Sequence, residues 1–128
     1  MEKILIVDDS SAARMIARRC LKIAGMEGKE FLEAEHGRAA LDVMKHNVVK
    51  LVIADLNMPV MDGQTLIRFM RSSPRLNEIP VVVVSSLVNQ STAEALKKMG
   101  ATVVLRKPLS PARMADALEY VAQLGQAA

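Results

Sequence analysis

Aromatic side chains are scarce in this sequence of 128 residues, where they make up 2% of the positions. Trp is absent, and the rings are those of Phe31, Phe69 and Tyr120. Modules that bind nucleic acid by stacking bases need several exposed rings, so this class of protein is disfavoured. The hydrophobic core must instead be built from Val, Ile, Leu, Ala and nine Met.

Cysteine and long apolar runs are also lacking. The single cysteine, Cys20, has no partner for an internal disulfide, which is typical of proteins in a reducing compartment. No apolar run approaches the roughly 20 residues of a membrane span, and the first residues do not resemble a signal peptide. We therefore expect a soluble, cytoplasmic protein with no membrane insertion.

The excess of positive charge is small, with 17 Lys and Arg against 14 Asp and Glu. The basic residues are spread along the whole chain and do not form the patch that marks a polyanion partner, so direct nucleic-acid binding is not expected. A hydrophobic share of 51% excludes a disordered tail. The length fits one domain, which we place at residues 1–128.

Short apolar runs alternate with helical patterns along the chain. The runs at residues 3–7, 50–54, 81–84 and 102–105 have the composition of strands covered on both faces, and the half-polar run at residues 29–35 suits the edge of a sheet. Strands that alternate with helices indicate an α/β fold with a five-stranded parallel sheet and helices on both of its faces.

Each of the five helices is expected to bury one apolar face. Gly25 and Gly100 are expected to end the first and fourth helices. A capping box of Ser91 and Glu94 is expected to start the fourth, and Ser110 to start the fifth. The predicted apolar faces consist of Ala13, Ile16, Ala17, Cys20, Leu21 and Ala24 in the first helix, Ala40, Leu41 and Met44 in the second, Leu66, Ile67, Phe69 and Met70 in the third, Leu96 and Met99 in the fourth, and Met114, Leu118 and Val121 in the fifth.

Polar side chains follow four of the five apolar runs: Asp8 and Asp9, Asp55, Ser85, and Lys107. The carboxyl ends of parallel strands meet at one edge of the sheet, where ligands bind. Three carboxylates at one edge repel each other, and Mg²⁺ relieves this repulsion because it prefers oxygen ligands. A nearby hydroxyl and ammonium complete a site suited to a phosphoryl group.

Taken singly, these residues also fit ordinary structural roles. The first two aspartates, with Ser10 and Ser11, are suited to capping the first helix. Asp55 fits a solvated charge at a strand end, Ser85 a turn residue and Lys107 a surface lysine. What favours a site is their joint occurrence after the first, third, fourth and fifth strands.

Four segments carry a resemblance to a known family: LIVDDS at residues 5–10, DLNMPVMDG at residues 55–63, VVVVSS at residues 81–86, and Lys107-Pro108. In this order they resemble the receiver domain of two-component response regulators, of the CheY-like stand-alone type. The resemblance spans essentially the whole chain. It implies a flavodoxin-like, doubly wound (βα)5 fold with the strand order 2-1-3-4-5.

The resemblance also implies roles for the residues of the predicted site. Asp55 corresponds to the phosphoacceptor, whose carboxylate attacks the phosphorus of a phosphohistidine on a partner kinase. Asp9 corresponds to a direct ligand of a Mg²⁺ cofactor and Asp8 to its partner, which binds through water. Asp55 and the backbone carbonyl of Asn57 correspond to the other ligands.

Ser85 and Lys107 correspond to the residues that hold the aspartyl phosphate. The implied chemistry is nucleophilic catalysis by a carboxylate, followed by electrostatic stabilisation of the product. Pro59 and Gly63 match the shaped loop after the third strand, and Asp62 is placed to cap the helix that follows. Such a protein catalyses its own phosphoryl transfer and slow dephosphorylation and is not classed as an enzyme.

The implied partners are a histidine kinase or phosphotransfer protein and a downstream protein target that the sequence does not identify. A monomer or weak dimer is expected, acting in chemotaxis, motility or a phosphorelay. The sequence stops soon after the fifth helix, so we expect a stand-alone regulator, with a receiver cut from a longer regulator as the alternative.

Two positions depart from the family pattern. Val104 replaces the usual Tyr or Phe, and its stiff β-branched side chain cannot act as a rotating ring in the output surface of the fourth helix, fifth strand and fifth helix. Leu87 is apolar where many relatives carry a polar side chain that orients hydrolytic water. We therefore expect a comparatively long-lived phosphorylated form and an output that does not depend on a ring.

The first helix carries a partial stripe of basic residues. Arg14, Arg18, Arg19 and Lys22 form either a solvated face or a docking surface for an acidic kinase or phosphotransfer partner.

Three other functions stay open. An aspartyl phosphohydrolase would need a second carboxylate two residues after its nucleophile, where Asn57 stands. A nucleotide or flavin binder would need a glycine-rich loop after the first strand, where Asp8 and Asp9 would repel phosphate. A phosphorylation-independent interaction module fits the loss of the ring at Val104.

Overall fold

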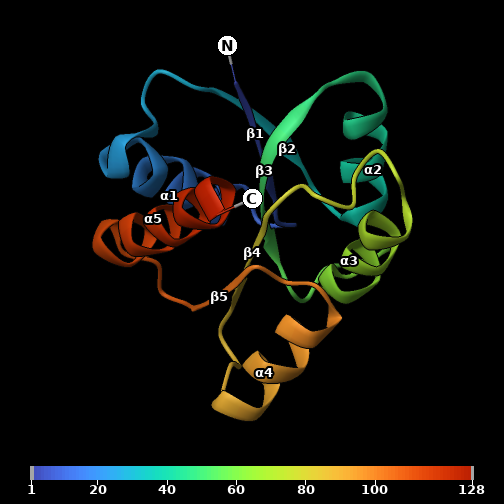
Figure 1. Ribbon diagram of the computed structural model, residues 1–128. Coiled ribbons are helices and arrows are strands. Elements are labelled where there is room, and N and C mark those ends of the chain that lie inside the picture. Colours follow the sequence, from blue (N-terminus) through green and yellow to red (C-terminus); the bar gives the residue numbers. More distant parts are fainter. Residues whose placement is uncertain (1, 128) are drawn as a thin grey trace.

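The computed structural model describes residues 2–127, which alternate between strand and helix from end to end (Figure 1). All neighbouring strands are parallel and follow the order β2-β1-β3-β4-β5, so the predicted fold class and strand order are confirmed. The strands are β1 (Lys3–Val7), β2 (Glu30–Ala34), β3 (Val49–Asp55), β4 (Val81–Ser85) and β5 (Val103–Arg106), and the helices are α1 (Ser11–Leu21), α2 (Gly37–His46), α3 (Gly63–Ser72), α4 (Gln90–Met99) and α5 (Pro111–Ala127), with a π-helical turn η1 (Lys22–Met26) after α1.

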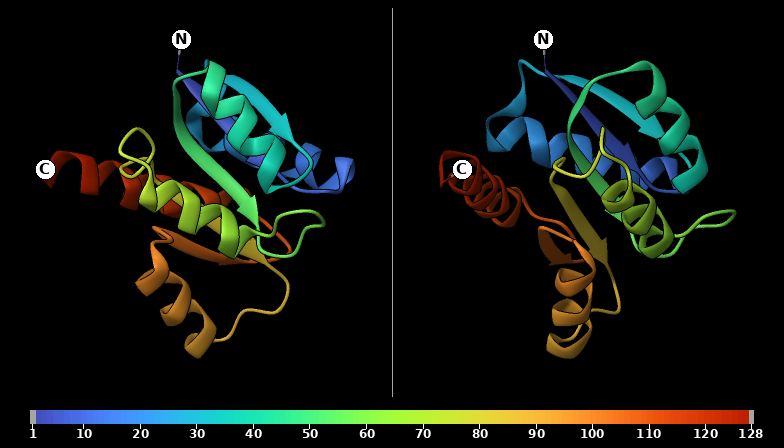
Figure 2. Two further views of the ribbon diagram at one scale, coloured as in Figure 1. Left: turned by 90° about the vertical axis from the view of Figure 1, so that its right-hand side faces the viewer. Right: turned by 45° about the vertical axis from the view of Figure 1, so that its right-hand side comes forward.

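The sheet lies between two layers of helices, with α1 and α5 on one face and α2, α3 and α4 on the other (Figures 1 and 2). Side chains along each strand alternate between the two faces. In β1, Leu5 and Val7 pack toward α2 and α3, whereas Ile4 and Ile6 pack toward α1 and α5. Each face therefore has its own hydrophobic core, and the helices hold the sheet from both sides.

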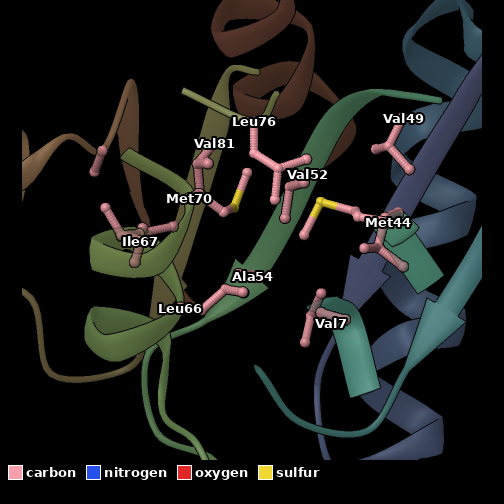
Figure 3. Packing of buried hydrophobic residues seen from close by; sticks show 14 of the residues in the cluster. Val7, Met44, Val49, Val52, Ala54, Leu66, Ile67, Met70, Leu76 and Val81 are labelled. Carbon is pink, nitrogen blue, oxygen red and sulfur yellow. The ribbon is translucent and has the colours of Figure 1, made fainter. Parts of the chain in front are cut away.

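Buried methionine side chains contribute to both hydrophobic cores. Met44 of α2 and Met70 of α3 are fully buried and reach toward β3 between smaller aliphatic side chains (Figure 3). Met114 of α5 is fully buried on the opposite face, where Cys20 of α1 is also buried. Burial raises the pKa of the Cys20 thiol, as expected for a core cysteine.

Two residues predicted to be buried are exposed instead. Ile16 of α1 is 50% exposed and Phe69 of α3 is 51% exposed. Their neighbours Ala17 and Met70 are buried, and one residue turns a helix by about 100°. Both residues lie at the margins of buried stripes that are narrower than the sequence pattern suggested.

The start of α4 also differs from the prediction of a capping box at Ser91 and Glu94. The cap is Asn89, whose Oδ1 accepts a hydrogen bond of 2.9 Å from the Thr92 amide. The Thr92 hydroxyl in turn accepts one of 2.9 Å from the Asn89 amide. Asn89 and Thr92 thus form a capping box of the same kind as the predicted one, but two residues earlier in the chain.

The other predicted helix ends agree with the structure. Gly100 caps α4 with φ of 126°, and Gly25 has φ of 110° in η1, beyond the regular part of α1. Ser110 precedes α5, and its hydroxyl accepts a hydrogen bond from the Arg113 amide. None of the described helices is long and apolar enough to cross a bilayer.

Gly63 at the start of α3 lies against the end of β3. Its amide donates to the Leu56 carbonyl at 3.0 Å, and a Cβ added to it would lie 2.5 Å from the Asp55 carbonyl oxygen. Real Cβ atoms do not approach a backbone oxygen this closely. The absence of a side chain therefore lets α3 begin directly beside Asp55.

We predict that Gly63→Ala lowers the free energy of unfolding by about 1–3 kcal/mol, because the new methyl group has to displace the backbone of Asp55 or Leu56. Chemical denaturation measures this change. Gly28→Ala is the matched control, since a Cβ at Gly28 meets nothing within 4 Å. Equal stability of the two variants would contradict the prediction.

Candidate functional site

Three carboxylates converge at the carboxyl edge of the sheet. Asp8 and Asp9 follow β1, and Asp55 is the last residue of the neighbouring strand β3. One carboxylate oxygen from each residue lies within 4.8 Å of the others. Asp8 and Asp55 are buried, whereas Asp9 is exposed. The parallel sheet thus brings residues almost fifty positions apart in sequence into one acidic cluster.

Lys107, which follows β5, is the cation of this cluster. Its Nζ lies 3.1 Å from Oδ2 of Asp8 and 3.4 Å from Oδ1 of Asp55. Burial lowers the pKa of the Lys107 ammonium, but the hydrogen bond and negative charge of Asp8, together with Asp55, outweigh it and make the net shift upward. Lys107 therefore stays charged and bridges two of the three carboxylates.

The pKa of Asp55 is raised despite this bridge. Burial is the largest cause, the charge of Asp8 adds to it, and Lys107 offsets these effects only in part. Ionised Asp55 is therefore held in a place that disfavours its charge. Such a carboxylate is ready to exchange this unfavourable state for contact with a cation or for a covalent bond.

The cluster fits a hard divalent cation. Three carboxylates and one ammonium leave an excess of two negative charges, and within the described residues Asp9 has no ion-pair partner. The donors are oxygen atoms, which Mg²⁺ prefers. The residues present could therefore hold Mg²⁺.

The turn after β1 serves the start of α1 as well as the cluster. Oδ1 of Asp8 accepts a hydrogen bond of 2.9 Å from the Ser10 amide, and Ser10 caps α1 by accepting from the Ala13 amide. The helix cap is thus Ser10, and the capping and site interpretations of this segment are compatible.

Ser85 is the last residue of β4, and Asn57 lies in the loop between β3 and α3. Ser85 ends β4, directly after Val84, the residue that pairs with Asp55. Its buried hydroxyl accepts a hydrogen bond of 3.2 Å from the Leu87 amide, and its carbonyl accepts one of 2.9 Å from the Lys107 amide. Asn57 is exposed two residues after Asp55.

The loop from β3 to α3 has one predicted cap and one feature that was not predicted. Oδ1 of Asp62 accepts a hydrogen bond of 2.9 Å from the Thr65 amide, and this bond lowers the pKa of the Asp62 carboxyl. Val60 has φ of 66°, which is rare for a β-branched residue. Backbone strain of this kind is typical of functional loops.

Sequence reasoning missed the role of Glu33 in β2. Its carboxylate pairs with Arg14 at 2.7 Å and with Arg18 at 2.5 Å, so two members of the basic stripe on α1 are bound within the chain. Arg18 and Lys22 also lie over the ring of Phe31, at 5.6 and 5.9 Å from its centroid. A glutamate on the predicted edge strand was the available signal for this pairing.

The acidic cluster opens to solvent and has little cavity of its own. The hollow lined by Asp8, Asp55 and Lys107 has a volume of about 20 Å³, enough for one water molecule. A hollow of about 730 Å³ near Lys3 and Lys50 lies at the opposite edge of the sheet, away from these groups.

Comparison with known proteins assigns this arrangement to a family. The family model for the response regulator receiver domain matches residues 4–119. The chain is 36% identical over 120 residues to the chemotaxis protein CheY1 of Helicobacter pylori, covering 93% of this chain and 95% of that protein. It is 34% identical over 124 residues to the chemotaxis protein CheY homolog of Campylobacter jejuni, covering 96% and 94%.

A solved structure agrees with these sequence relatives. The chemotaxis response regulator CheY4 of Vibrio cholerae superposes with a TM-score of 0.82 at 30% identity, covering 94% of this chain and 98% of that one. The phosphohydrolase and nucleotide-binding alternatives are therefore no longer favoured. The chain belongs to the response regulator receiver domain family, whose members are phosphoacceptors in phosphorylation-activated two-component signalling.

Proposed function

We propose that Asp55 accepts a phosphoryl group from a phosphohistidine of a histidine kinase or phosphotransfer protein. The observation that carries this proposal is the meeting of Asp8, Asp9, Asp55 and Lys107 at one edge of the sheet. Asp55 suits the acceptor role because it is the carboxylate whose pKa burial and Asp8 raise. Because its surroundings disfavour the ionised form, Asp55 gains from contact with a cation or from a covalent bond.

In the transfer, a carboxylate oxygen of Asp55 attacks phosphorus while the bond from phosphorus to the histidine nitrogen breaks. The electron pair of that bond stays on the imidazole. Asp8, Asp9, Asp55 and the Asn57 carbonyl would hold Mg²⁺, which when bound offsets negative charge on the phosphoryl oxygens. Lys107 supplies a second positive charge, since its Nζ lies 3.4 Å from Oδ1 of Asp55.

Ser85 and Lys107 hold the product. The Ser85 hydroxyl accepts from the Leu87 amide and keeps its own proton free to donate to a phosphoryl oxygen. Phosphorylation adds charge and acceptor oxygens at this edge, and Ser85 and Lys107 gain contacts in one conformation only. Such differential contacts are what shift an equilibrium between two states.

The output route passes through the loop between β4 and α4. Val104 has no ring to rotate, and it packs half-buried against the core next to α4. The hydrogen bond from the Leu87 amide to the Ser85 hydroxyl instead ties Ser85 to the loop that leads into α4. At its other end, α4 is anchored because the Arg71 guanidinium donates to the Gly100 carbonyl at 2.9 and 3.0 Å. A displaced Ser85 would therefore move mainly the start of α4.

The downstream role is control of a protein target by α4, β5 and α5. Relatives from Helicobacter pylori and Campylobacter jejuni are named chemotaxis proteins, which supports a role in chemotaxis or motility. The chain would act by protein contact, as a monomer or weak dimer, without binding nucleic acid directly.

We predict that the wild type incorporates one phosphoryl group from a small phosphodonor such as acetyl phosphate when Mg²⁺ is present, and that Asp55→Asn abolishes this incorporation. Intact-protein mass spectrometry measures it. The matched control is Asp62→Asn in the same loop, which keeps a helix-capping side chain and should be labelled normally. Undiminished labelling of Asp55→Asn would overturn the assignment of the acceptor, and an unlabelled wild type would favour a phosphorylation-independent module.

We predict that Leu87→Glu shortens the lifetime of the phosphorylated form severalfold. Leu87 is 76% exposed two residues after Ser85, and a carboxylate there can orient an attacking water. A time course of phosphate release measures the rate, with Leu124→Glu on α5 as the control for an added surface charge. An unchanged or slower rate in Leu87→Glu would sink the idea that Leu87 protects the aspartyl phosphate.

A further inference from the structure

Arg14 is a largely enclosed arginine that joins three elements at the edge of the acidic cluster. Its side chain is 12% exposed, although it lies in the first turns of α1. Nη1 donates to the Asp8 carbonyl oxygen at 2.5 Å, and Nε lies 2.7 Å from Oε1 of Glu33 in β2. Arg14 thus connects α1 with the end of β1 and with the edge strand.

The carbonyl that Arg14 holds belongs to the peptide that joins Asp8 to Asp9. The planar peptide links the two residues rigidly, so fixing this oxygen sets the direction in which the chain leaves Asp8. The Asp8 amide is held as well, by a hydrogen bond of 3.1 Å to the Ala34 carbonyl. Lys107 and the Ser10 amide hold the Asp8 carboxylate.

Asp9 has no comparable support of its own. It is exposed, and the described residues provide its carboxylate with no hydrogen bond or ion pair. Its place in the acidic cluster therefore depends on the backbone that carries it. Two side chains hold this backbone: the Asp8 carboxylate accepts from the Ser10 amide, and Arg14 donates to the Asp8 carbonyl.

Glu33 holds Arg14 in this position. The planar guanidinium presents Nε to Glu33 and Nη1 to Asp8, so that the first bond orients the second. The Glu33 carboxylate is shared with Arg18, so it offsets only part of the positive charge that Arg14 places beside the acidic cluster.

We infer that Arg14 is a positioning residue for the metal ligands Asp8 and Asp9, and that Glu33 orients it. This inference rests on the proposed Mg²⁺ site. Outer groups that fix metal ligands typically contribute tenfold or more to metal affinity. Arg14 acts through the backbone of Asp8 and does not contact the metal.

Positioning and simple electrostatics predict opposite effects when Arg14 is removed. Removing a positive charge beside the cluster would tighten Mg²⁺ binding through Coulomb attraction alone. Loss of the hydrogen bond to Asp8 would weaken binding, because Asp8 and Asp9 would have to be ordered by the metal itself. The direction of the change in affinity therefore identifies the mechanism.

The test is isothermal titration calorimetry with Mg²⁺ on the full chain. We expect Arg14→Ala to raise the Kd for Mg²⁺ about tenfold. Arg18→Ala is the matched control, since Arg18 also pairs with Glu33 but does not contact Asp8, and its Kd should stay within about twofold of wild type. An unchanged or tighter Kd in Arg14→Ala would overturn the inference.

A second variant and a second measurement separate positioning from a general structural role. Glu33→Gln keeps the shape of the side chain but weakens its hold on Arg14, and should raise the Kd by about threefold. Acetyl phosphate labelling of both variants should need more Mg²⁺ but reach the wild-type rate at saturation. A lower saturated rate with unchanged Mg²⁺ dependence would contradict positioning. A wild type that binds no Mg²⁺ would refute the metal site itself, whereas equal binding by wild type and both variants would refute only the role of Arg14.

Discussion

Repulsion among Asp8, Asp9 and Asp55 is the constraint on which the rest of the site depends. Their oxygens lie within 4.8 Å of one another, and Lys107 compensates only part of the charge. A protein selected for stability alone would disperse such a cluster, because like charges this close disfavour the ionised state. The fold instead holds it in place through packing on both faces of the sheet. The retained repulsion favours a divalent cation at this edge, and a bound cation would in turn offset the negative charge of a phosphoryl group.

Much of the surrounding structure holds these charges where they are. The parallel sheet aligns the ends of β1, β3, β4 and β5 at one edge. Gly63 lets α3 begin against the Asp55 carbonyl, and Ser10 starts α1 directly after the acidic pair. The Lys107 amide donates a hydrogen bond to the Ser85 carbonyl, which connects the loop after β5 to the end of β4. The proposed acceptor, Asp55, is therefore connected to β4 and β5 through strand pairing and backbone hydrogen bonds, and none of these connections involves an aromatic ring.

The site could be predicted from the sequence because its members stand at the ends of apolar runs, and topology alone brings such ends together. Contacts that depend on the direction of a side chain are harder to predict from the sequence. The bond from Arg14 to the Asp8 carbonyl depends on how α1 lies over β2, and composition of a helix cannot reveal which of four basic residues turns inward. The exposure of Phe69 was not predictable for the same reason, because this apolar residue lies just outside the buried stripe of α3. Different pairs of residues can also cap a helix equally well, and α4 is capped by Asn89 and Thr92 in place of the predicted Ser91 and Glu94.

The most direct test of the central claim compares the unfolding free energies of wild type and Asp55→Asn, in EDTA and in excess Mg²⁺. Because burial and Asp8 raise the pKa of Asp55, its ionised form opposes folding, and Asp55→Asn should be the more stable protein in EDTA. Mg²⁺ at ten times its Kd should stabilise the wild type by ~1.4 kcal/mol and the variant by less. The account would be contradicted if Asp55→Asn were less stable than wild type in EDTA and Mg²⁺ stabilised both proteins equally.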